Sequence, residues 1–429
     1  MSLRSDTKIA SVRGRQIFDS RGRPTVEADV GLAGGARGRA SVPSGASTGR
    51  HEAHELRDGD PAVHGGRGVG KAVAAVNAEI AQGLVGHDAG EQKLVDATLR
   101  HLDGSEQLGR LGANAVLAVS LAVCRAAARA RAVPLHRHIA SLAENAAPSL
   151  PMPMVNILSG GAHAAQSMDL QDFLVIPIGA ASFSDALRMS MQIRRSADEV
   201  CARRGLPTLL ADEGGLSPAC RRVADALDLV VESIESAGFV PGRDVAIAID
   251  VAASGLYTQG KYELRNEGLR LSGDETIAAA REWRNRYPIV SIEDLLHEDD
   301  WEGWTRLTSS MPDLQILGDD LFATNPARID RGIHARAANA VLIKPNQNGT
   351  LSGTLDAIAQ ARRGGFSTIV SARSGETEDS FIADLAVGTG AGQIKIGSVR
   401  TSERMAKYNQ LVRIEEDASL PFAGWIGRG

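Results

Sequence analysis

The stretch that decides the fold is AIAID (246–250), a short apolar run that stops on Asp250. Five later runs follow the same plan: IVSIED (289–294) with Glu293, LQILGDD (314–320) with Asp319, AVLIKPN (340–346) with Lys344, STIVSAR (367–373) with Arg373 and QIKIG (393–397) with Lys395. Short continuous apolar runs are typical of strands that are buried on both faces. We therefore predict successive buried strands, each with a charged residue at its carboxyl end.

The segments between these runs have the length of helical connections, so strands and helices alternate over 152–417. Repeated strand–helix units fit either a closed barrel or an open, doubly wound sheet. An open sheet concentrates its site at one switch point, whereas a barrel brings the ends of many strands to one face. The many charged strand ends therefore predict an α/β fold with a C-terminal (β/α)8-type barrel over 148–429.

Residues 1–147 are predicted to form a smaller N-terminal α+β domain. The pattern over 8–42 alternates apolar and polar residues with turn signals, which indicates an antiparallel meander. Helical periodicity follows over 71–144. Between them, 43–70 is rich in glycine, serine and charge, and an irregular stretch of this length is usually functional. We expect 43–70 to be a mobile loop near the site.

Composition excludes several classes of partner. The chain has 429 residues, 43% of them hydrophobic, and a net charge of −5, which argues against nucleic acid or an anionic membrane as its main partner. We find no run of 18 apolar residues and no apolar core of a signal peptide at the N-terminus. The three cysteines form no CxxC pair. We expect a cytoplasmic protein without a transmembrane helix.

Three acids at strand ends, Asp250, Glu293 and Asp319, form the strongest candidate site. A single acid at such a position would more often cap a helix or join a salt bridge. Three together would repel one another and would have raised pKa values, unless a divalent cation bound them. Ligands that are all oxygen, without histidine or cysteine, favour Mg²⁺ or Mn²⁺ over zinc.

Lys344 and Lys395 stand out because the chain has only seven lysines against forty arginines. An arginine cannot act as a general base, but a lysine can, once neighbouring cations lower its pKa. The alternative is that both lysines are structural partners of the acids.

Weaker signals surround this set. ADEGG (211–215) places Glu213 in a glycine-flanked turn, where a carboxyl group could act as a general acid. His163, Gln171 and Asp172 follow the apolar run VNIL and could line the same mouth, although a structural role is the simpler interpretation of His163 alone.

Two apparent motifs fail on inspection. GGRGVGKA (65–72) resembles a phosphate-binding loop, but it has Ala72 where serine or threonine is needed, and no buried strand precedes it. HEAH (51–54) is one residue short of a zinc-binding HExxH and is interpreted as a solvated segment that leads from a loop into a helix.

Together these stretches resemble the enolase family, and the resemblance covers nearly the whole chain. The matching stretches include DSRGRPTVEADV (19–30), SVPSGASTG (41–49), LGANAVLAVSLA (111–122), DEGG (212–215), YPIVSIED (287–294), RSGETED (373–379) and NQLVRIEE (409–416). The resemblance implies a variant (β/α)8 barrel behind an α+β domain, which agrees with the element order above. It also implies a homodimer or higher homo-oligomer.

The resemblance implies a role for each matching residue. The metal ligands are Asp250, Glu293 and Asp319 for one Mg²⁺, and Ser44 for a second Mg²⁺ that binds with substrate. The catalytic residues are Lys344 as base and Glu213 as acid. The substrate-binding residues are Lys395 at the carboxylate, Arg373 and Ser374 at the phosphate, and His163 and Gln171 in the pocket wall. The implied substrate is a small phosphorylated or phosphonylated carboxylate.

The chain departs from the family near the phosphate and the acid. The family's Ser-His-Arg-Ser is Ser371-Ala372-Arg373-Ser374 here, so the imidazole that faces the phosphate is missing. Loss of one charge-assisted hydrogen bond costs roughly 1.5–3 kcal/mol. The family's glutamate after Leu-Gln is Asp172, one methylene shorter.

These departures favour a diverged enolase-type enzyme with an intact metal site and base. Our hypothesis is that it removes the proton α to the carboxylate of 2-phosphoglycerate or a close analogue and forms an enolpyruvate product. Carboxyphosphonoenolpyruvate synthase, an enzyme of phosphonate natural-product biosynthesis, is a relative of this kind. The alternatives are an ordinary glycolytic phosphopyruvate hydratase and a non-catalytic binding protein.

Overall fold

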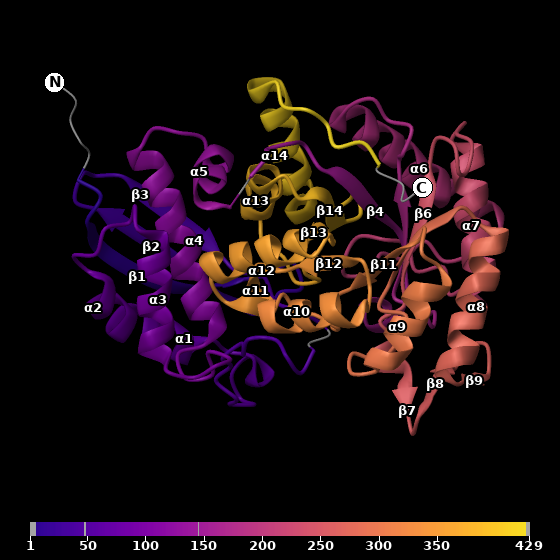
Figure 1. The fold of residues 1–429 in the computed structure, drawn as a ribbon, viewed down its shortest axis with the longest axis horizontal. Helices are drawn as coiled ribbons and strands as arrows, with labels where there is room; N and C mark the ends of the chain where they lie inside the picture. The colour runs from indigo at the N-terminus through magenta and orange to yellow at the C-terminus, as the bar shows by residue number, and fades with distance from the viewer. Residues whose placement is uncertain (1–5, 47–48, 145, 426–429) are drawn as a thin grey trace.

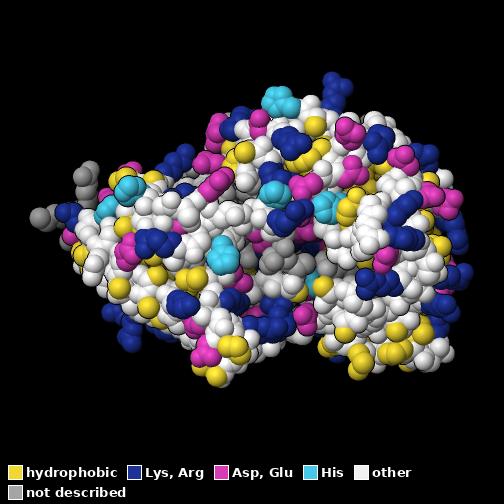
Figure 2. All heavy atoms as spheres, turned by 90° about the horizontal axis from the view of Figure 1, so that it is seen from below, with side chains coloured by type: hydrophobic (Ala, Val, Ile, Leu, Met, Phe, Trp, Pro, Cys, Tyr) yellow, Lys and Arg dark blue, Asp and Glu magenta, His cyan; other side chains and the backbone are white. Residues whose placement is uncertain are grey.

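The computed structural model describes residues 6–46, 49–144 and 146–425, and it divides into an N-terminal α+β part and a barrel (Figure 1). The N-terminal part contains the indigo and purple segments of Figure 1, and the barrel contains the magenta to yellow segments. On the face shown in Figure 2, lysine and arginine side chains are interspersed with aspartate and glutamate.

The N-terminal sheet is an antiparallel meander, as predicted. Its strands are β1 (Ile9–Phe18), β2 (Pro24–Leu32) and β3 (Arg37–Ser41), in the order β1-β2-β3. The helices that follow are α1 (Gly70–Ala75), which continues through a π-helical turn (Val76–Ile80) into α2 (Ala81–Leu84), then α3 (Gln92–Asp103), α4 (Ala113–Ala130) and α5 (Leu135–Leu142).

Helix α4 is the centre of this domain and packs on β2 and β3. It is also the one helix in the described part of the chain that is long and apolar enough to cross a membrane, but 83% of it is buried inside the protein. The close approach of α4 to β3 depends on Gly38, where a Cβ atom would lie 2.5 Å from the Ala126 nitrogen and still closer to the Ala122 oxygen.

The predicted loop, 43–70, is largely irregular in its described residues. A single 3₁₀ turn (His64–Gly66) precedes α1, which begins at Gly70. The backbone nitrogens of Gly70 and Lys71 both donate to the Asp58 carboxylate, at 2.8 Å each. GGRGVGKA is therefore an entry into a helix, as expected from its missing hydroxyl residue. The mobility of the loop remains a prediction.

The second part is a closed eight-stranded barrel with the strand order β10-β11-β12-β13-β14-β4-β5-β6, which confirms the predicted fold. Its strands are β4 (Met152–Ser159), β5 (Asp172–Ile176), β6 (Ala246–Asp250), β10 (Ile289–Glu293), β11 (Gln315–Gly318), β12 (Ala340–Ile343), β13 (Ser367–Ser371) and β14 (Gly392–Gly397).

The barrel is a variant because β5 runs antiparallel to both β4 and β6, while the other neighbouring strands are parallel. Residues 160–171 connect β4 to β5 through a 3₁₀ turn (Gly161–Ala164) and no α-helix. Parallel neighbours are usually joined by a helical crossover, and this connection contains no α-helix, so the chain folds back as a hairpin.

Helices cover the outside of the barrel. They are α6 (Phe183–Arg203), α7 (Val223–Ser236), α8 (Gly273–Arg286), α9 (Trp301–Ser310), α10 (Pro326–Ala335), the short α11 (Pro345–Asn348), α12 (Leu351–Arg363), α13 (Phe381–Thr389) and α14 (Ser402–Ala418). A small antiparallel sheet of β7 (Tyr257–Thr258), β8 (Lys261–Leu264) and β9 (Leu269–Leu271) follows β6.

The strand interiors form two apolar layers, because strands covered on both faces alternate between the barrel interior and the helices. One buried cluster joins residues of six strands: Met152, Met154, Leu174, Ile176, Ala248, Leu317, Ala340, Leu342 and Ile369. The charged residues follow at the carboxyl ends. The apolar cluster therefore supports the mouth in which the charged side chains meet.

The contact at Gly38 gives a stability prediction. Gly38→Ala should lower the free energy of unfolding by about 1–3 kcal/mol, because the added methyl group must push α4 away from β3. Gly424→Ala is the matched control, since nothing lies within 4 Å of a Cβ there, and it should change stability by less than about 0.5 kcal/mol. Equal urea midpoints for the two variants would contradict this packing.

Candidate active site

The six charged residues of the apolar runs meet at one end of the barrel. Asp250 and Glu293 are the last residues of β6 and β10. Asp319 and Lys344 directly follow β11 and β12, Arg373 lies two residues after β13, and Lys395 lies within β14. Because these strands are parallel, their carboxyl ends form a single rim, as the sequence predicted.

Lys395 connects the first two acids. Its buried Nζ donates to Asp250 Oδ2 at 2.8 Å and to Glu293 Oε2 at 2.7 Å. Burial lowers the pKa of Lys395, but Asp250 and Glu293 outweigh it, and the net pKa lies well above its usual value. Burial, followed by the nearby Asp250 charge, raises the pKa of Glu293 well above normal. This is the crowding expected for neighbouring acids.

Lys344 pairs with the third acid. Its Nζ donates to Asp319 Oδ2, and Gln347 Nε2 donates to Asp319 Oδ1 at 2.8 Å. We expected neighbouring cations to lower the pKa of Lys344. In this structure the opposite holds: burial and Arg373 lower it, but the Asp319 carboxylate outweighs them, and the net pKa is raised.

A second group of acids, which the sequence did not single out, surrounds Asp319. Carboxylate oxygens of Asp294, Asp319 and Asp320 lie within 4.8 Å of one another. Asp294 holds the turn, because its two oxygens accept from the backbone nitrogens of Asp319 and Asp320 at 2.9 Å each. Burial and the Asp319 charge raise the pKa of Asp320 to about 8.

The donor set fits a hard divalent cation. Within the described residues, Asp250, Glu293 and Asp319 are not as close together as the Asp294 group, yet all three line the rim. Glu293 Oε1 is buried and has no hydrogen-bond partner in the described part of the chain. A buried carboxylate oxygen without a donor is costly, and a cation bound by oxygen ligands would satisfy it.

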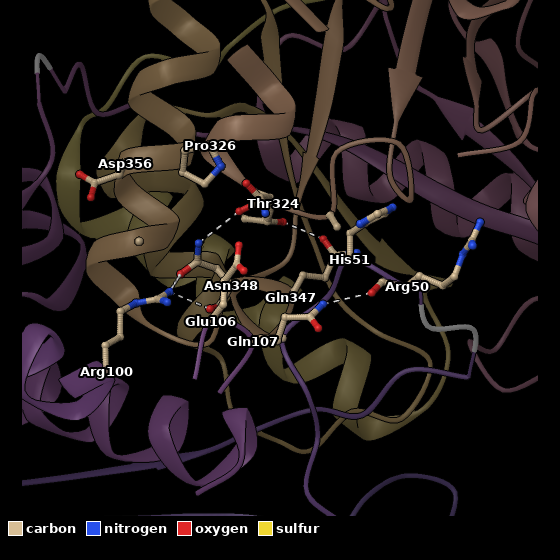
Figure 3. A pocket seen from close by; sticks show the side chains of 14 residues that line it. Arg50, His51, Arg100, Glu106, Gln107, Thr324, Pro326, Gln347, Asn348 and Asp356 are labelled. Atoms are coloured by element: carbon tan, nitrogen blue, oxygen red, sulfur yellow. Dashed lines mark hydrogen bonds between the residues drawn. The ribbon is translucent and has the colours of Figure 1, made fainter. Parts of the chain in front are cut away.

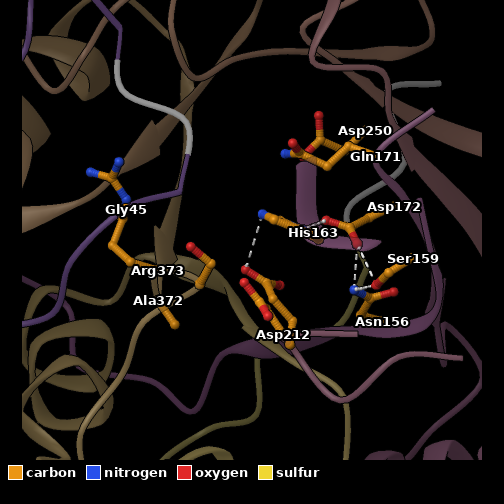
Figure 4. A network of polar contacts seen from close by, with 12 residues as sticks. Gly45, Asn156, Ser159, His163, Gln171, Asp172, Asp212, Asp250, Ala372 and Arg373 are labelled. Carbon is orange, nitrogen blue, oxygen red and sulfur yellow. Dashed lines mark hydrogen bonds and ion pairs between the residues drawn. The ribbon is translucent and has the colours of Figure 1, made fainter. Parts of the chain in front are cut away.

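A histidine and two acids form a second cluster at the mouth (Figure 4). Within this His163 cluster, one ligand atom from each of His163, Asp172 and Glu213 lies within 4.8 Å of the others. His163 Nδ1 lies 3.2 Å from Asp172 Oδ2, and His163 Nε2 lies 3.8 Å from Glu213 Oε1. Burial lowers the pKa of His163, but Asp172 and Glu213 outweigh it and raise it to about 9.

Two residues of β4, neither of them predicted as a site residue, hold Asp172 in this cluster. Asn156 Nδ2 donates to Asp172 Oδ1 at 2.5 Å, and Ser159 Oγ donates to the same atom at 2.8 Å. Glu213 lies in a turn that is attached to His163 through the bond from Asp212 N to His163 O, at 3.2 Å. The His163 cluster thus comes from β4, the hairpin and the turn at 211–215.

The connection between β4 and β5 must be compact to place His163. Gly161 has φ +47°, and a Cβ at Gly160 would lie 2.5 Å from the Leu170 oxygen. Gln171, also predicted to line the pocket, donates through Nε2 to Asp250 Oδ2 at 3.2 Å. The hairpin therefore joins the His163 cluster to the rim.

The predicted phosphate side lies across the opening from Asp172, where Figure 4 shows Ala372 and Arg373 together. Ala372 is buried, and its backbone nitrogen donates to the Lys395 oxygen at 2.9 Å. Arg373 is also buried and makes a two-pronged ion pair with Glu52, with Nη1–Oε2 at 2.8 Å and Nη2–Oε1 at 3.2 Å. Ser374 Oγ accepts from Arg21 Nη1 at 3.1 Å.

Glu52 lies within HEAH, which we expected to be a solvated segment leading into a helix. That expectation is wrong for Glu52, which is buried in a non-helical loop. A single acid in a polar loop gives no local sign that it will meet an arginine more than 300 residues away. The sequence therefore missed the partner of Arg373.

Ser44 is held on the N-terminal side of the mouth. Its backbone exchanges hydrogen bonds with Gly375, at 2.8 and 2.9 Å. Its hydroxyl donates to Glu55 Oε2 and accepts from Arg57 Nη2, at 2.9 Å each. In this arrangement the hydroxyl is already engaged, and its role as a ligand of a second cation remains a prediction.

A barrel whose rim combines carboxylates with two lysines, behind an α+β domain, defines an enzyme of the enolase superfamily. Comparison with protein families agrees along the chain. The model described as the enolase C-terminal TIM barrel domain matches residues 147–425, and the enolase N-terminal domain model matches residues 9–139. The chain belongs to the enolase family, whose members generally use Mg²⁺.

The His163 cluster gives a prediction for stability against pH. The pKa of His163 is raised from 6.5 to about 9. The ion pairs of protonated His163 with its acids therefore stabilise the fold fully below pH 6.5, and this stabilisation is lost as the pH rises through about 9. The free energy of unfolding should fall by about 1–3 kcal/mol across this window. Urea titrations at several pH values measure it.

Asp172→Asn should flatten this pH dependence because it removes the main partner of His163. Asp169→Asn is the control, since Asp169 is a buried acid nearby that accepts from Asn266 instead. If wild type and Asp172→Asn have the same slope between pH 6.5 and 9, the ion pair does not carry the effect.

Proposed function

We propose that this enolase-family enzyme removes the proton α to a carboxylate in 2-phosphoglycerate or a close analogue, in a Mg²⁺-dependent reaction that gives an enolpyruvate product. We further propose that it is specialised at phosphorus, in the manner of carboxyphosphonoenolpyruvate synthase. One contrast carries the proposal: the acids and lysines of the rim are all present, whereas Ala372 replaces the family's histidine beside Arg373.

The acids at the rim would hold the metal. Asp250, Glu293 and Asp319 would bind one Mg²⁺, and a second would bind with substrate near Ser44. Bound there, Mg²⁺ supplies positive charge that stabilises a carboxylate whose α-proton is being removed.

The two lysines have different tasks. Lys395 is a buried ammonium group held by two carboxylates, and it would bind the substrate carboxylate. Lys344 would take the α-proton through Nζ, which requires a neutral amine. Its pairing with Asp319 opposes that state, so base function requires Asp319 to share its charge with another partner.

The His163 cluster supports the second half of the reaction. Glu213 is buried and faces the imidazole of His163. Glu213 would protonate the departing 3-hydroxyl group, and His163 would contact the substrate. The shorter Asp172 is held by Asn156 and Ser159, so its carboxylate pairs with His163 rather than reaching further into the mouth.

Ala372 supports specialisation because it removes a charged hydrogen-bond donor and leaves only a methyl group. A phosphate group would lose one interaction, whereas a bulkier group at phosphorus would gain room. Ordinary phosphopyruvate hydratase activity is the second candidate function, because that reaction needs the same acids and lysines, and all of them are present at the rim.

The first test is an absorbance assay at 240 nm with 2-phosphoglycerate and Mg²⁺. We expect slow turnover that EDTA abolishes, and a loss of about 10²–10⁴-fold in Lys344→Ala because the base is removed. Wild-type turnover of about 1–10³ s⁻¹, the usual enzyme range, would contradict specialisation. Equal rates for wild type and Lys344→Ala would show that the chain is not this catalyst.

The second test restores the histidine. Ala372→His should raise kcat/KM for 2-phosphoglycerate about ten- to a hundredfold, because a charge-assisted hydrogen bond is regained. Ala372→Leu adds bulk without a donor and should not increase kcat/KM. An unchanged kcat/KM in Ala372→His would show that position 372 does not set the preference at phosphorus.

A further inference from the structure

Glu52 occupies the position on Arg373 that the proposed function gives to the substrate's phosphorus-bearing group. Both terminal nitrogens of the guanidinium contact the Glu52 carboxylate, and Nη1 also donates to Asn346 Oδ1 at 3.1 Å. This is the two-pronged geometry with which arginine binds phosphate and carboxylate ligands. An anion cannot form the same pair of bonds while Glu52 remains in place.

Charge around Arg373 is already balanced without a ligand. The Glu52 carboxylate neutralises Arg373, and Arg21, which donates to Ser374, has its own acid in Asp19 at 3.3 Å. Ala372 contributes no charge. An incoming anion therefore competes with a carboxylate of the chain itself, and it must offer Arg373 a stronger partner.

The segment that carries Glu52, residues 49–55, has room to move. One cavity of about 590 Å³ and another of about 320 Å³ are both lined by Arg50, Ala53 and Gln107. Figure 3 shows Arg50, His51 and Gln107 at the larger cavity, beside Gln347 and Thr324. Few packed neighbours on either side lower the cost of a local opening.

Polar contacts hold this segment in place, and at its far end His54 N donates to Gln107 O at 2.7 Å while Ala113 N donates to His54 O at 2.8 Å. Ala53 N donates to Gln347 O at 2.8 Å, and Gln107 Nε2 donates to the backbone oxygens of Arg50 and Glu52 at 3.1 Å each. Arg50 pairs with Glu298 and Asp299, but its side chain is 67% exposed, so these pairs contribute little. The Glu52 carboxylate itself makes buried contacts, namely the pair with Arg373 and a longer bond from Gln347 Nε2 to Oε1 at 3.4 Å.

We propose that Glu52 is a specificity-determining residue, which occupies the anion-binding position of Arg373 until an anionic substrate group displaces it. This inference rests on the proposed function only in taking Arg373 as the site of the phosphorus-bearing group. A dianionic phosphoryl or phosphonyl group forms the same paired bonds with more charge than Glu52 brings. A simple carboxylate brings no more charge than Glu52 and must also open segment 49–55. Glu52 thus sets an affinity threshold that favours dianions.

Isothermal titration calorimetry with inorganic phosphate tests the proposal. Glu52→Gln keeps the shape of the side chain and removes its charge, so phosphate should bind about ten- to a hundredfold more tightly than to wild type. Acetate, too weak to measure on wild type, should become measurable on the variant. Glu106→Gln is the matched control: Glu106 lines the larger cavity, and the same charge change there should alter phosphate affinity less than about twofold.

Unchanged or weaker phosphate binding in Glu52→Gln would overturn the proposal, because it would mean that Glu52 orients Arg373 for its ligand. If Glu52→Gln does not fold, the same phosphate titration of Glu52→Asp tests the proposal instead. Its shorter carboxylate cannot keep both bonds, so phosphate should bind at least about threefold more tightly, and wild-type affinity would again overturn the proposal. The measurement needs no turnover, so failure of the 2-phosphoglycerate assay leaves it interpretable.

Discussion

The mouth of the barrel depends on one interaction, the contact of Lys395 with both Asp250 and Glu293. Two buried carboxylates at the ends of neighbouring strands would repel each other, and burial would favour their neutral forms. One ammonium group that donates to both carboxyl groups offsets this repulsion and lets β6 and β10 end side by side. Because β14 supplies that ammonium group from across the barrel, a closed sheet is needed to complete the pair. Fold and site are therefore stabilised by the same contact.

Much of the fold was predictable because most of its strands can be recognised from their own sequence. Short, mainly apolar runs that are each followed by a charge can be recognised without knowledge of their neighbours, and so can the alternating pattern of β1 to β3. The direction of β5 was not predictable from its composition, since its residues, Asp172–Ile176, would suit a parallel strand equally well. What distinguishes it is the connection after β4, which has no helix to carry the chain back along the barrel. The β7–β9 sheet, with strands of only two to four residues, was too small to give a pattern.

The site was predictable where a residue's meaning is local. A strand that ends on Asp250 or Lys344 implies a place on the rim, wherever its neighbours are. Glu52, Asn156 and Asp294 were missed because each acquires its role from a partner that the chain brings near only on folding: an arginine, a buried carboxylate and a pair of backbone nitrogens. The raised pKa of Lys344 was missed for a related reason, since Asp319 lies closer to it than the cations that were expected to act on it.

The reversed strand β5 also separates two parts of the site that differ in how the sequence supplies their residues. Six separate strands contribute one residue each to the rim, so a change in any one of them disturbs a shared set of charges. The hairpin from Asn156 to Asp172, in contrast, is one continuous piece of sequence, with bonds within itself, to the turn at 211–215 and, through Gln171, to Asp250. In evolutionary terms the hairpin is a module, meaning a continuous segment whose residues can be substituted together while the residues of the rim stay the same. Asp172 lies in this module, so a new substrate preference can arise there without rebuilding the barrel.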